Sequence, residues 1–280
     1  MIAAQRGCKE AVEVLLEHEK GMSDSQNHNA LYHALRSGHT EVVEIIIPHE
    51  DPTDENGVTA LMRAAERGDV EAVRVLIPLQ KKQEATERVY INRWPISHGT
   101  ALMGAAACGH TEVVRLLVEH EGGMRNDLGT TALMFVVCNE HKECIELLLE
   151  EACMQDEDGW TALMWAAHYG HLECVRLLVE KEAGKYYCEG LTPLMMAVRN
   201  SHTECVKLLM EKEGGMYNDN GWTALMVAAY WNRLGCARLL AEREKDMKTT
   251  RKWFGFPPGA TALSIAKRMG HKRIASLLRK

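Results

Sequence analysis

The 280-residue chain carries a net charge of −6, and only 6% of its residues are aromatic. No apolar run approaches the ~18 residues of a membrane span, and charge follows the start too soon for a signal peptide. Residues 245–280 contain ten Lys or Arg and one acid, a local balance of +9 that leaves −15 for the rest. We therefore expect no membrane insertion and, because the body is acidic, no nucleic-acid binding.

A four-residue string recurs along the chain. Thr-Ala-Leu-Met occurs at 59–62, 100–103, 131–134, 161–164 and 223–226, Thr-Pro-Leu-Met at 192–195, and weaker copies at 29–31 and 261–263. Between Leu133 and Leu225 the leucines of these strings are 30 or 31 residues apart. A fixed period of this length predicts a solenoid of stacked units, with function on a repeated surface.

Residues 156–188 illustrate the predicted unit. Residues 156–159 form a turn, Thr161 N-caps a short first helix, and Gly170 ends that helix. A second helix opens at His171, with inner positions at Cys174, Val175, Leu177 and Leu178. Leu163 and Leu177 are thus expected to be buried, one on each helix.

Residues 156–171 read Asp-Glu-Asp-Gly-Trp-Thr-Ala-Leu-Met-Trp-Ala-Ala-His-Tyr-Gly-His, which resembles the ankyrin-repeat pattern turn-Gly-x-Thr-Pro-Leu-His-x-Ala-Ala-x-x-Gly-His. The resemblance implies an all-α ankyrin-repeat α-solenoid of about nine helix-turn-helix units, the N-terminal one incomplete, with no sheet. Two departures are systematic: Met replaces the family's His after Leu, and most units are about two residues short. Both resemble the ankyrin-only scaffold proteins of diplomonad protists.

We expect one solenoid over residues 1–280, with units at roughly 1–24, 25–53, 54–80, 81–125, 126–155, 156–186, 187–217, 218–247 and 248–280. The leucine spacing stretches in the fourth and ninth units, which places inserted loops at 81–98 and 248–258. The first contains Tyr90 and Trp94, and the second contains residues 253–256, Trp-Phe-Gly-Phe. These insertions are either tolerated surface loops or binding devices, and their aromatic residues favour binding a partner or folding back on the solenoid.

The two ends differ in pattern. Met1 aligns with Met62, so the first unit lacks its turn and Thr cap, and Ala3, Ala4, Val12 and Leu15 have no preceding unit to pack against. This predicts upstream sequence or a partner that covers this end. At the other end, basic residues surround Ile274 and Leu278, as in a polar capping repeat.

Several residue types repeat with the unit. His-x-Glu-Cys occurs at 141–144, 171–174 and 202–205, a spacing that can place two metal ligands on one helix. The His matches the family's helix-opening residue, and the Cys of this ladder (Cys144, Cys174, Cys205 and Cys236) replaces a core Val, so we interpret both as structural. The Met of each string is likewise interpreted as core, and the acidic pairs that end second helices, such as Glu211 and Glu213, as solvated.

No phosphate-binding Gly loop, nucleophile elbow or kinase string is present. We therefore expect no catalytic residues, no metal, no cofactor and no enzyme activity. Buried free cysteines favour a reducing compartment, which predicts a cytoplasmic protein, with cytoskeletal association as a further option.

Partners of ankyrin arrays lie against the concave groove of turn tips and first helices, so the resemblance implies a set of exposed partner-binding positions. They are Asp158, Trp160, His168, Tyr169, Glu189, Leu191, Arg199, Asn200, Asp219, Trp222, Tyr230 and Trp231. Exposed Trp and Tyr are typical of binding hot spots. The alternative is that Trp160 and Trp222 pack along the neighbouring turn.

These observations predict a non-catalytic scaffold that binds partner proteins through this groove, as a monomer with additional contacts through the uncapped N-terminal unit. Two alternatives stay open. One is a regulatory or targeting tail of an ankyrin-linked protein kinase whose catalytic domain is absent here. The other is metal or redox sensing through exposed, low-pKa thiols of the Cys ladder.

Overall fold

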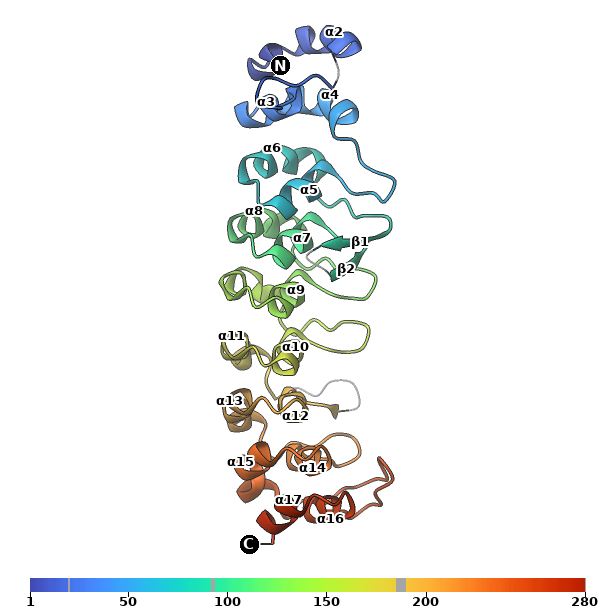
Figure 1. The fold of residues 1–280 in the computed structure, drawn as a ribbon, viewed down its shortest axis with the longest axis vertical. Helices are drawn as coiled ribbons and strands as arrows, with labels where there is room; N and C mark the ends of the chain where they lie inside the picture. The colour runs from blue at the N-terminus through green and yellow to red at the C-terminus, as the bar shows by residue number, and fades with distance from the viewer. Residues whose placement is uncertain (20, 92–93, 185–189, 280) are drawn as a thin grey trace. The chain divides into compact units, whose positions relative to one another are not determined.

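The computed structural model describes residues 1–19, 21–91, 94–184 and 190–279 (Figure 1). The chain divides into two compact units, Met1–Glu151 and Ala152–Lys280. In each unit a first helix, a tight turn and a second helix form a pair, and successive pairs pack against one another. The predicted fold class, an all-α solenoid of helix-turn-helix units, is confirmed.

In the first unit the pairs are α1 (Ile2–Gln5) with α2 (Lys9–Glu19), α3 (Ala30–Ser37) with α4 (Thr40–Glu50), α5 (Ala60–Arg67) with α6 (Val70–Gln80), α7 (Ala101–Cys108) with α8 (Thr111–Glu121), and α9 (Ala132–Cys138) with the 3₁₀-helices η1 (Lys142–Cys144) and η2 (Glu146–Glu151). In the second unit they are α10 (Ala162–Tyr169) with α11 (Leu172–Glu182), α12 (Pro193–Arg199) with α13 (Thr203–Glu213), α14 (Ala224–Tyr230) with α15 (Leu234–Glu244), and α16 (Ala262–Arg268) with α17 (Lys272–Leu277).

The first insertion forms a two-stranded antiparallel hairpin, β1 (Arg88–Ile91) and β2 (Trp94–Ser97). The expectation of no sheet is therefore wrong at this insertion. Backbone bonds from Ala85 N–H to the Gly99 carbonyl (3.0 Å) and from Thr86 N–H to the Asn56 carbonyl (2.8 Å) hold its base. The backbone groups of the two strands thus pair with each other, and those at the base of the hairpin pair with the neighbouring turn.

First helices begin at the Thr of the repeated string. At Thr192 the hydroxyl accepts a hydrogen bond from Met195 N–H at 3.3 Å, and Pro193 occupies the first helical position, as predicted. Thr161 also takes the N-cap position, but without a capping side-chain bond. Gly170 ends α10 with φ 81°, and a Cβ there would collide with the His202 ring, so glycine is required twice over.

A buried acid at the end of α8, η2, α11, α13 and α15 connects neighbouring repeats. Glu213 is 0% exposed, and its carboxylate accepts hydrogen bonds from Leu194 N–H (2.8 Å) in its own repeat and from Gly184 N–H (3.1 Å) in the preceding one. Equivalent bonds join Glu121, Glu151 and Glu244 to Leu102, Leu133 and Leu225. Each carboxylate satisfies an N–H that the start of a first helix leaves unpaired.

The interpretation of these acids as solvated is therefore wrong for one member of each pair: Glu121, Glu151, Glu182 and Glu213 are all buried. The same error shifted the predicted inner face of the second helix. Leu163 is 0% exposed, as expected, but Leu177 is 36% exposed and Leu178 is buried in its place. With Glu182 at the centre of the inner face of α11, Leu177 points roughly 140° away from that centre.

The fifth repeat accommodates a deletion in its second helix. Glu151 follows the leucine that it binds, Leu133, by 18 residues, whereas Glu182 and Glu213 follow theirs by 19. This segment is 3₁₀ rather than α-helical. Because a 3₁₀-helix rises ~2.0 Å per residue rather than ~1.5 Å, fewer residues cover the distance, and Glu151 still reaches Leu133 N–H at 2.8 Å.

In five of the described turns the opening residue is Asp or Asn, and which of the two occurs there depends on the residue nine positions later. Oδ1 of Asp24, Asp54, Asn126, Asp156 and Asn218 accepts backbone N–H bonds across the turn. Where the later residue is a donor, the opening residue is Asp, and its Oδ2 binds His33, Arg63 or Trp165. Where it is apolar, as at Phe135 and Val227, the opening residue is Asn. The turn therefore requires only Oδ1, which Asp and Asn both have. Oδ2 of Asp is required only where a side chain on the first helix donates to it.

Replacing Leu163 with Ala should lower the free energy of unfolding by roughly 2–5 kcal/mol, since the side chain is fully buried. Leu177→Ala should cost less than about 1 kcal/mol. Urea denaturation followed by circular dichroism measures both. Equal losses for the two variants would contradict the packing described.

Glu213→Gln should keep the fold, because Gln80 already fills this role and accepts from Leu61 N–H at 2.8 Å. Glu213→Ala should cost about 1–3 kcal/mol, because it leaves buried N–H groups unpaired.

The stabilities of Glu213→Gln and the unsubstituted protein should also depend differently on pH. Burial raises the pKa of Glu213, although bonds from Leu194, Gly184 and Thr192 lower it. Because the pKa of this carboxyl group is higher in the folded than in the unfolded protein, protonating it stabilises the fold. This stabilisation is present at low pH and is lost as the pH rises through the folded-state pKa. The stability of Glu213→Gln relative to the unsubstituted protein should thus decrease between pH 7.5 and pH 4.5. A difference that does not change with pH would contradict the raised pKa.

Candidate functional site

The second unit gathers aromatic side chains on the face formed by its turns and first helices. In the repeat of α10, the ring centroids of Trp160 and Trp165 lie 4.7 Å apart, and Trp165 stacks on Tyr169 at 5.8 Å. Trp165 is anchored by a bond from its Nε1 to Asp156 Oδ2 at 3.0 Å. Tyr169 is 38% exposed, so this cluster presents its outer ring to solvent.

His168 links this cluster to the next repeat. Its Nδ1 lies 3.1 Å from Asn200 Nδ2, which can donate to it, and its ring lies against Trp160. Burial lowers the pKa of His168, and the nearby Arg199 and His202 add to the effect. The imidazole therefore favours its neutral form, which leaves Nδ1 available as an acceptor.

The second insertion folds back onto α14. Backbone bonds from Thr250 and Arg251 N–H to the Asn220 carbonyl (3.0 and 3.2 Å) fix its start, and Trp253 and Phe256 bridge its tip. Phe254 stacks on Tyr230 with centroids 5.0 Å apart, and the ring of Trp253 meets Trp222 edge-on at 5.0 Å. The expectation that this loop folds back on the repeats is thus met, and folding back does not exclude contact with a partner.

The folded loop closes one side of an apolar pocket of about 400 Å³. It is lined by Leu191, Met195, Met196, Arg199, Trp222, Val227, Tyr230, Trp231, Trp253 and Phe254. Trp231 and Phe254 are 41% and 53% exposed at its rim. The Arg199 guanidinium lies 5.4 Å from the Trp231 ring centroid and is the one charged group of the lining.

Trp222 does not lie where the sequence pattern placed it. It is 1% exposed, and four aromatic neighbours pack around it: Tyr230, Trp253, Phe254 and Phe256. The expectation that this position is exposed is therefore wrong. Its indole forms the floor of the pocket, and the alternative, packing along the neighbouring turn, describes it correctly.

The other candidate residues are spread along the face. Arg199, Asp158 and Asp219 are exposed, and Trp160, Leu191 and Asn200 are half-buried. Glu189 lies outside the described residues. The structure therefore brings Leu191, Arg199, Trp222, Tyr230 and Trp231 into one pocket and leaves the two aspartates at turn tips outside its lining.

Sequence reasoning missed Trp165, Met195, Met196 and Val227 as members of this face. Trp165, Met196 and Val227 occupy one position, two residues after the leucine of the string, and their side chains follow the same surface of successive first helices. An aromatic or bulky residue recurring at this position was the available signal. It was overlooked because the family pattern leaves the position unspecified.

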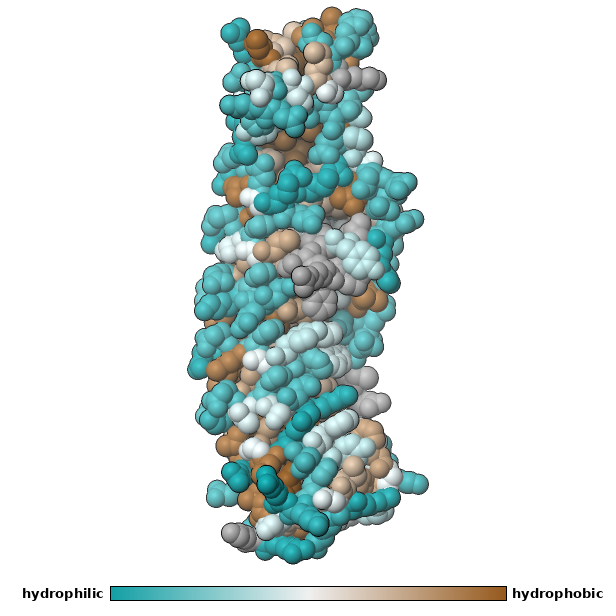
Figure 2. Space-filling model, in the orientation of Figure 1, coloured by the Kyte–Doolittle hydropathy of each residue, from teal (hydrophilic) through white to brown (hydrophobic). Residues whose placement is uncertain are grey.

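The face shown in Figure 2 is dominated by hydrophilic residues, with apolar surface in separate patches. One patch lies at the N-terminal end, where Ile2 and Val14 are 68% and 67% exposed. Of the four residues expected to lack a packing partner, Ala4 and Val12 are buried, Ala3 is half-buried and Leu15 is 37% exposed.

The comparisons with known proteins agree with this architecture. The sequence matches the family model described as ankyrin repeats (3 copies) over residues 1–88, 102–187 and 182–251. The chain belongs to the ankyrin-repeat family. The crystal structure of the ankyrin repeat domain of Bcl-3, described as a unique member of the IkappaB protein family, matches with a TM-score of 0.63 and 26% identity. The match covers 81% of this chain and 100% of that domain.

Two relatives show similarity over shorter stretches. Ankyrin repeat domain-containing protein 63 of Mus musculus is 36% identical over 101 residues, 34% of this chain and 24% of that protein. Inversin of Danio rerio is 35% identical over 91 residues, 31% of this chain and 8% of that protein. The chain thus spans about a quarter or less of the length of these relatives.

Within the described ankyrin repeats, none of the helices combines the length and apolar character that a membrane-spanning segment requires.

The His and Cys ladder has structural roles within these ankyrin repeats. His202 Nε2 lies 3.0 Å from the His168 carbonyl, and His141 Nε2 lies 3.2 Å from the Ala107 carbonyl, so each ring binds the preceding repeat. Cys174 and Cys205 are buried, and burial raises the pKa of the Cys205 thiol to about 11. These are the opposite of the exposed, low-pKa thiols that redox sensing requires.

Trp222→Ala should lower the free energy of unfolding by roughly 3–5 kcal/mol, because it removes a buried indole from the aromatic cluster. Phe254→Ala, at the exposed rim, should cost less than about 1 kcal/mol. Chemical denaturation monitored by circular dichroism separates the two. If Phe254→Ala is as destabilising as Trp222→Ala, the loop is part of the core rather than a wall of the pocket.

Proposed function

We propose that this chain is a non-catalytic scaffold that binds partner proteins through the aromatic face of α10, α12 and α14. Ankyrin repeats generally mediate protein–protein interaction, and this is the coarse function that family membership carries. The observation that supports the specific surface is the pocket that Trp222, Tyr230, Trp231 and the 248–258 loop enclose.

The chemistry of the pocket favours an apolar anchor from the partner. Its lining is aromatic and aliphatic apart from Arg199, and large planar rings bury much area at a small cost in side-chain entropy. Trp231 and Phe254 already stand exposed at the rim, so a partner side chain gains contact with both on entry. A Trp, Phe or Leu side chain fits such a site.

The charges around the pocket suggest the flanking residues of the partner. Arg199 favours a carboxylate directly beside the anchor. The exposed Asp158 and Asp219 at the turn tips favour basic residues further along the partner. We therefore propose a partner segment with an apolar anchor, an adjacent acid and more distant basic residues.

Three finer statements accompany this proposal. We place the protein in the cytoplasm, where free buried cysteines stay reduced, and we propose that it acts as a monomer. The departures in repeat length and the Met of the string support a kinship with the ankyrin-only proteins of diplomonad protists. No observation on the described residues favours a kinase tail over a scaffold.

Tyr169→Ala and Trp231→Ala should each weaken partner binding by more than about 1 kcal/mol and change thermal stability little, since both rings are more than a third exposed. The probe is a displayed library of short peptides with a central Trp, Phe or Leu and varied flanking charges. Selected peptides are then measured by calorimetry against each variant.

Leu177→Ala is the matched control, because Leu177 is similarly exposed but lies on the second helix α11. It should leave binding unchanged. If Tyr169→Ala and Trp231→Ala instead melt the protein and spare binding, both residues are packing residues and the surface is misassigned. A library that yields no peptide dependent on Arg199 would overturn the proposed acidic neighbour of the anchor.

A further inference from the structure

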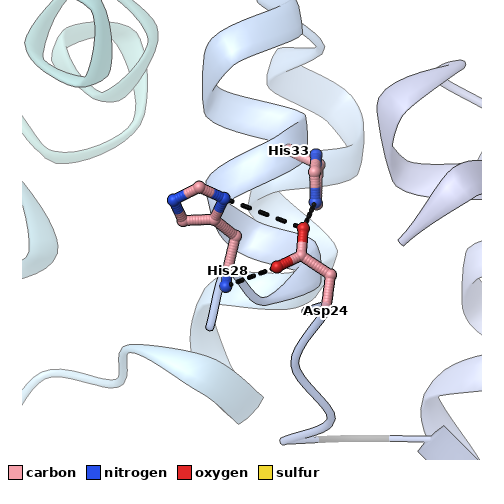
Figure 3. Close-up of side chains that lie close together, drawn as sticks. All are labelled: Asp24, His28 and His33. Carbon is pink, nitrogen blue, oxygen red and sulfur yellow. Dashed lines mark hydrogen bonds and ion pairs between the residues drawn. The ribbon is translucent and has the colours of Figure 1, made fainter. Parts of the chain in front are cut away.

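Three potential metal ligands meet in the second repeat, outside the aromatic face. Asp24 opens the turn before α3, His28 ends that turn, and His33 lies on α3, and their side chains converge in Figure 3. Asp24 Oδ2 lies 2.9 Å from His33 Nε2 and 3.7 Å from His28 Nδ1. One ligand atom from each residue lies within 4.8 Å of the other two, and all three side chains are half-exposed.

The turn orients the carboxylate. Asp24 Oδ1 accepts backbone N–H bonds from Gln26 (2.8 Å) and His28 (3.0 Å), which directs Oδ2 towards the two imidazoles. The carboxylate is the form of this side chain that binds metal ions.

The His28 ring is also held in place. It stacks on Tyr32 with centroids 3.8 Å apart and an interplanar angle of 8°, and the Arg36 guanidinium lies 5.4 Å from the Tyr32 ring centroid. A ligand ring fixed by packing loses less entropy when it binds a metal.

The other repeats distinguish this cluster from an ordinary turn. A bond between the turn Asp and the residue nine positions later recurs in the pair Asp156–Trp165, so the Asp24–His33 bond alone is explained by the repeat. His28 is not explained in this way: its counterparts are Val58, Thr130, Trp160 and Trp222. Of the turns that the structure describes, the one at Asp24 places two imidazoles beside the carboxylate.

The separations fit a tetrahedral ion. Zinc bonds of ~2.0–2.1 Å to nitrogen and oxygen place tetrahedral ligands about 3.3 Å apart, and the observed 2.9 and 3.7 Å lie on either side of that value. Imidazole nitrogen with carboxylate oxygen is a ligand set that zinc and similar divalent transition metals prefer.

We propose that Asp24, His28 and His33 form a three-ligand binding site for a divalent transition metal, with zinc as the best fit and water as the fourth ligand. Such an ion would join the turn to α3 and clamp the second repeat. The sequence-based expectation of no metal had weighed the His-x-Glu-Cys ladder and not this turn.

The test is titration of the full chain with zinc chloride by calorimetry and with cobalt chloride by visible absorption. One equivalent of zinc should bind. Cobalt should give the bands of a nitrogen and oxygen site, without the sulfur-to-metal charge-transfer absorption that the cysteines would produce.

The other repeats supply matched variants. His28→Val copies Val58, His33→Trp copies Trp165, which keeps the bond to its Asp, and Asp24→Asn copies Asn126 and Asn218, which keep the turn bonds. Each should lower zinc affinity by more than about tenfold while the circular dichroism spectrum stays unchanged. Cys174→Val and Cys205→Val should not alter the zinc affinity.

Two results would overturn the proposal: no zinc binding by the unsubstituted chain at micromolar concentrations, or binding that survives both His28→Val and His33→Trp. Loss of zinc binding in Cys174→Val or Cys205→Val would also contradict the proposal, because the ligands would then belong to the Cys ladder.

Discussion

The hydrogen bonds of a buried carboxylate to two neighbouring repeats are the constraint on which this structure depends. A first helix of seven or eight residues is too short to be stable alone, and its N-terminal N–H groups have no helical partners. Glu213 and its counterparts accept from the leucine of the string in one repeat and from the joint that follows the preceding second helix. The orientation of the first helix, and of the face it presents, follows from these bonds.

The aromatic pocket shows how this framework supports a surface that no single repeat could form. Met196 on α12, Trp222 and Tyr230 around α14, and Phe254 on the inserted loop come from three successive repeats. Trp222 supplies the floor because it is buried, while Trp231 and Phe254 remain exposed at the rim. Trp160 and Trp222 occupy equivalent positions in their repeats, but only Trp222 is fully buried, because the neighbouring insertion covers it.

Sequence periodicity was enough to predict the helix pairs, the Thr and Gly boundaries, and the buried Met and Cys positions, because each depends on local spacing repeated many times. It misplaced Leu177, since the inner face was centred without the buried Glu182. It misplaced Trp222, because the course of an inserted loop is not periodic. It could not find the Asp24 cluster, since one histidine in the turn and another on α3 become notable only when their ring nitrogens are seen beside the carboxylate. The binding residues themselves remain predictions.

The 3₁₀ segment of the fifth repeat has a consequence for how the chain opens. Its hydrogen bonds are geometrically poorer than those of an α-helix, and it ends at Glu151, where one compact unit gives way to the next. In a repeat array, cooperativity is carried by the interactions of nearest neighbours, so one weak repeat divides the array into blocks that open separately. The deletion of one residue before Glu151 would thus limit how many neighbouring ankyrin repeats are destabilised when one repeat is perturbed.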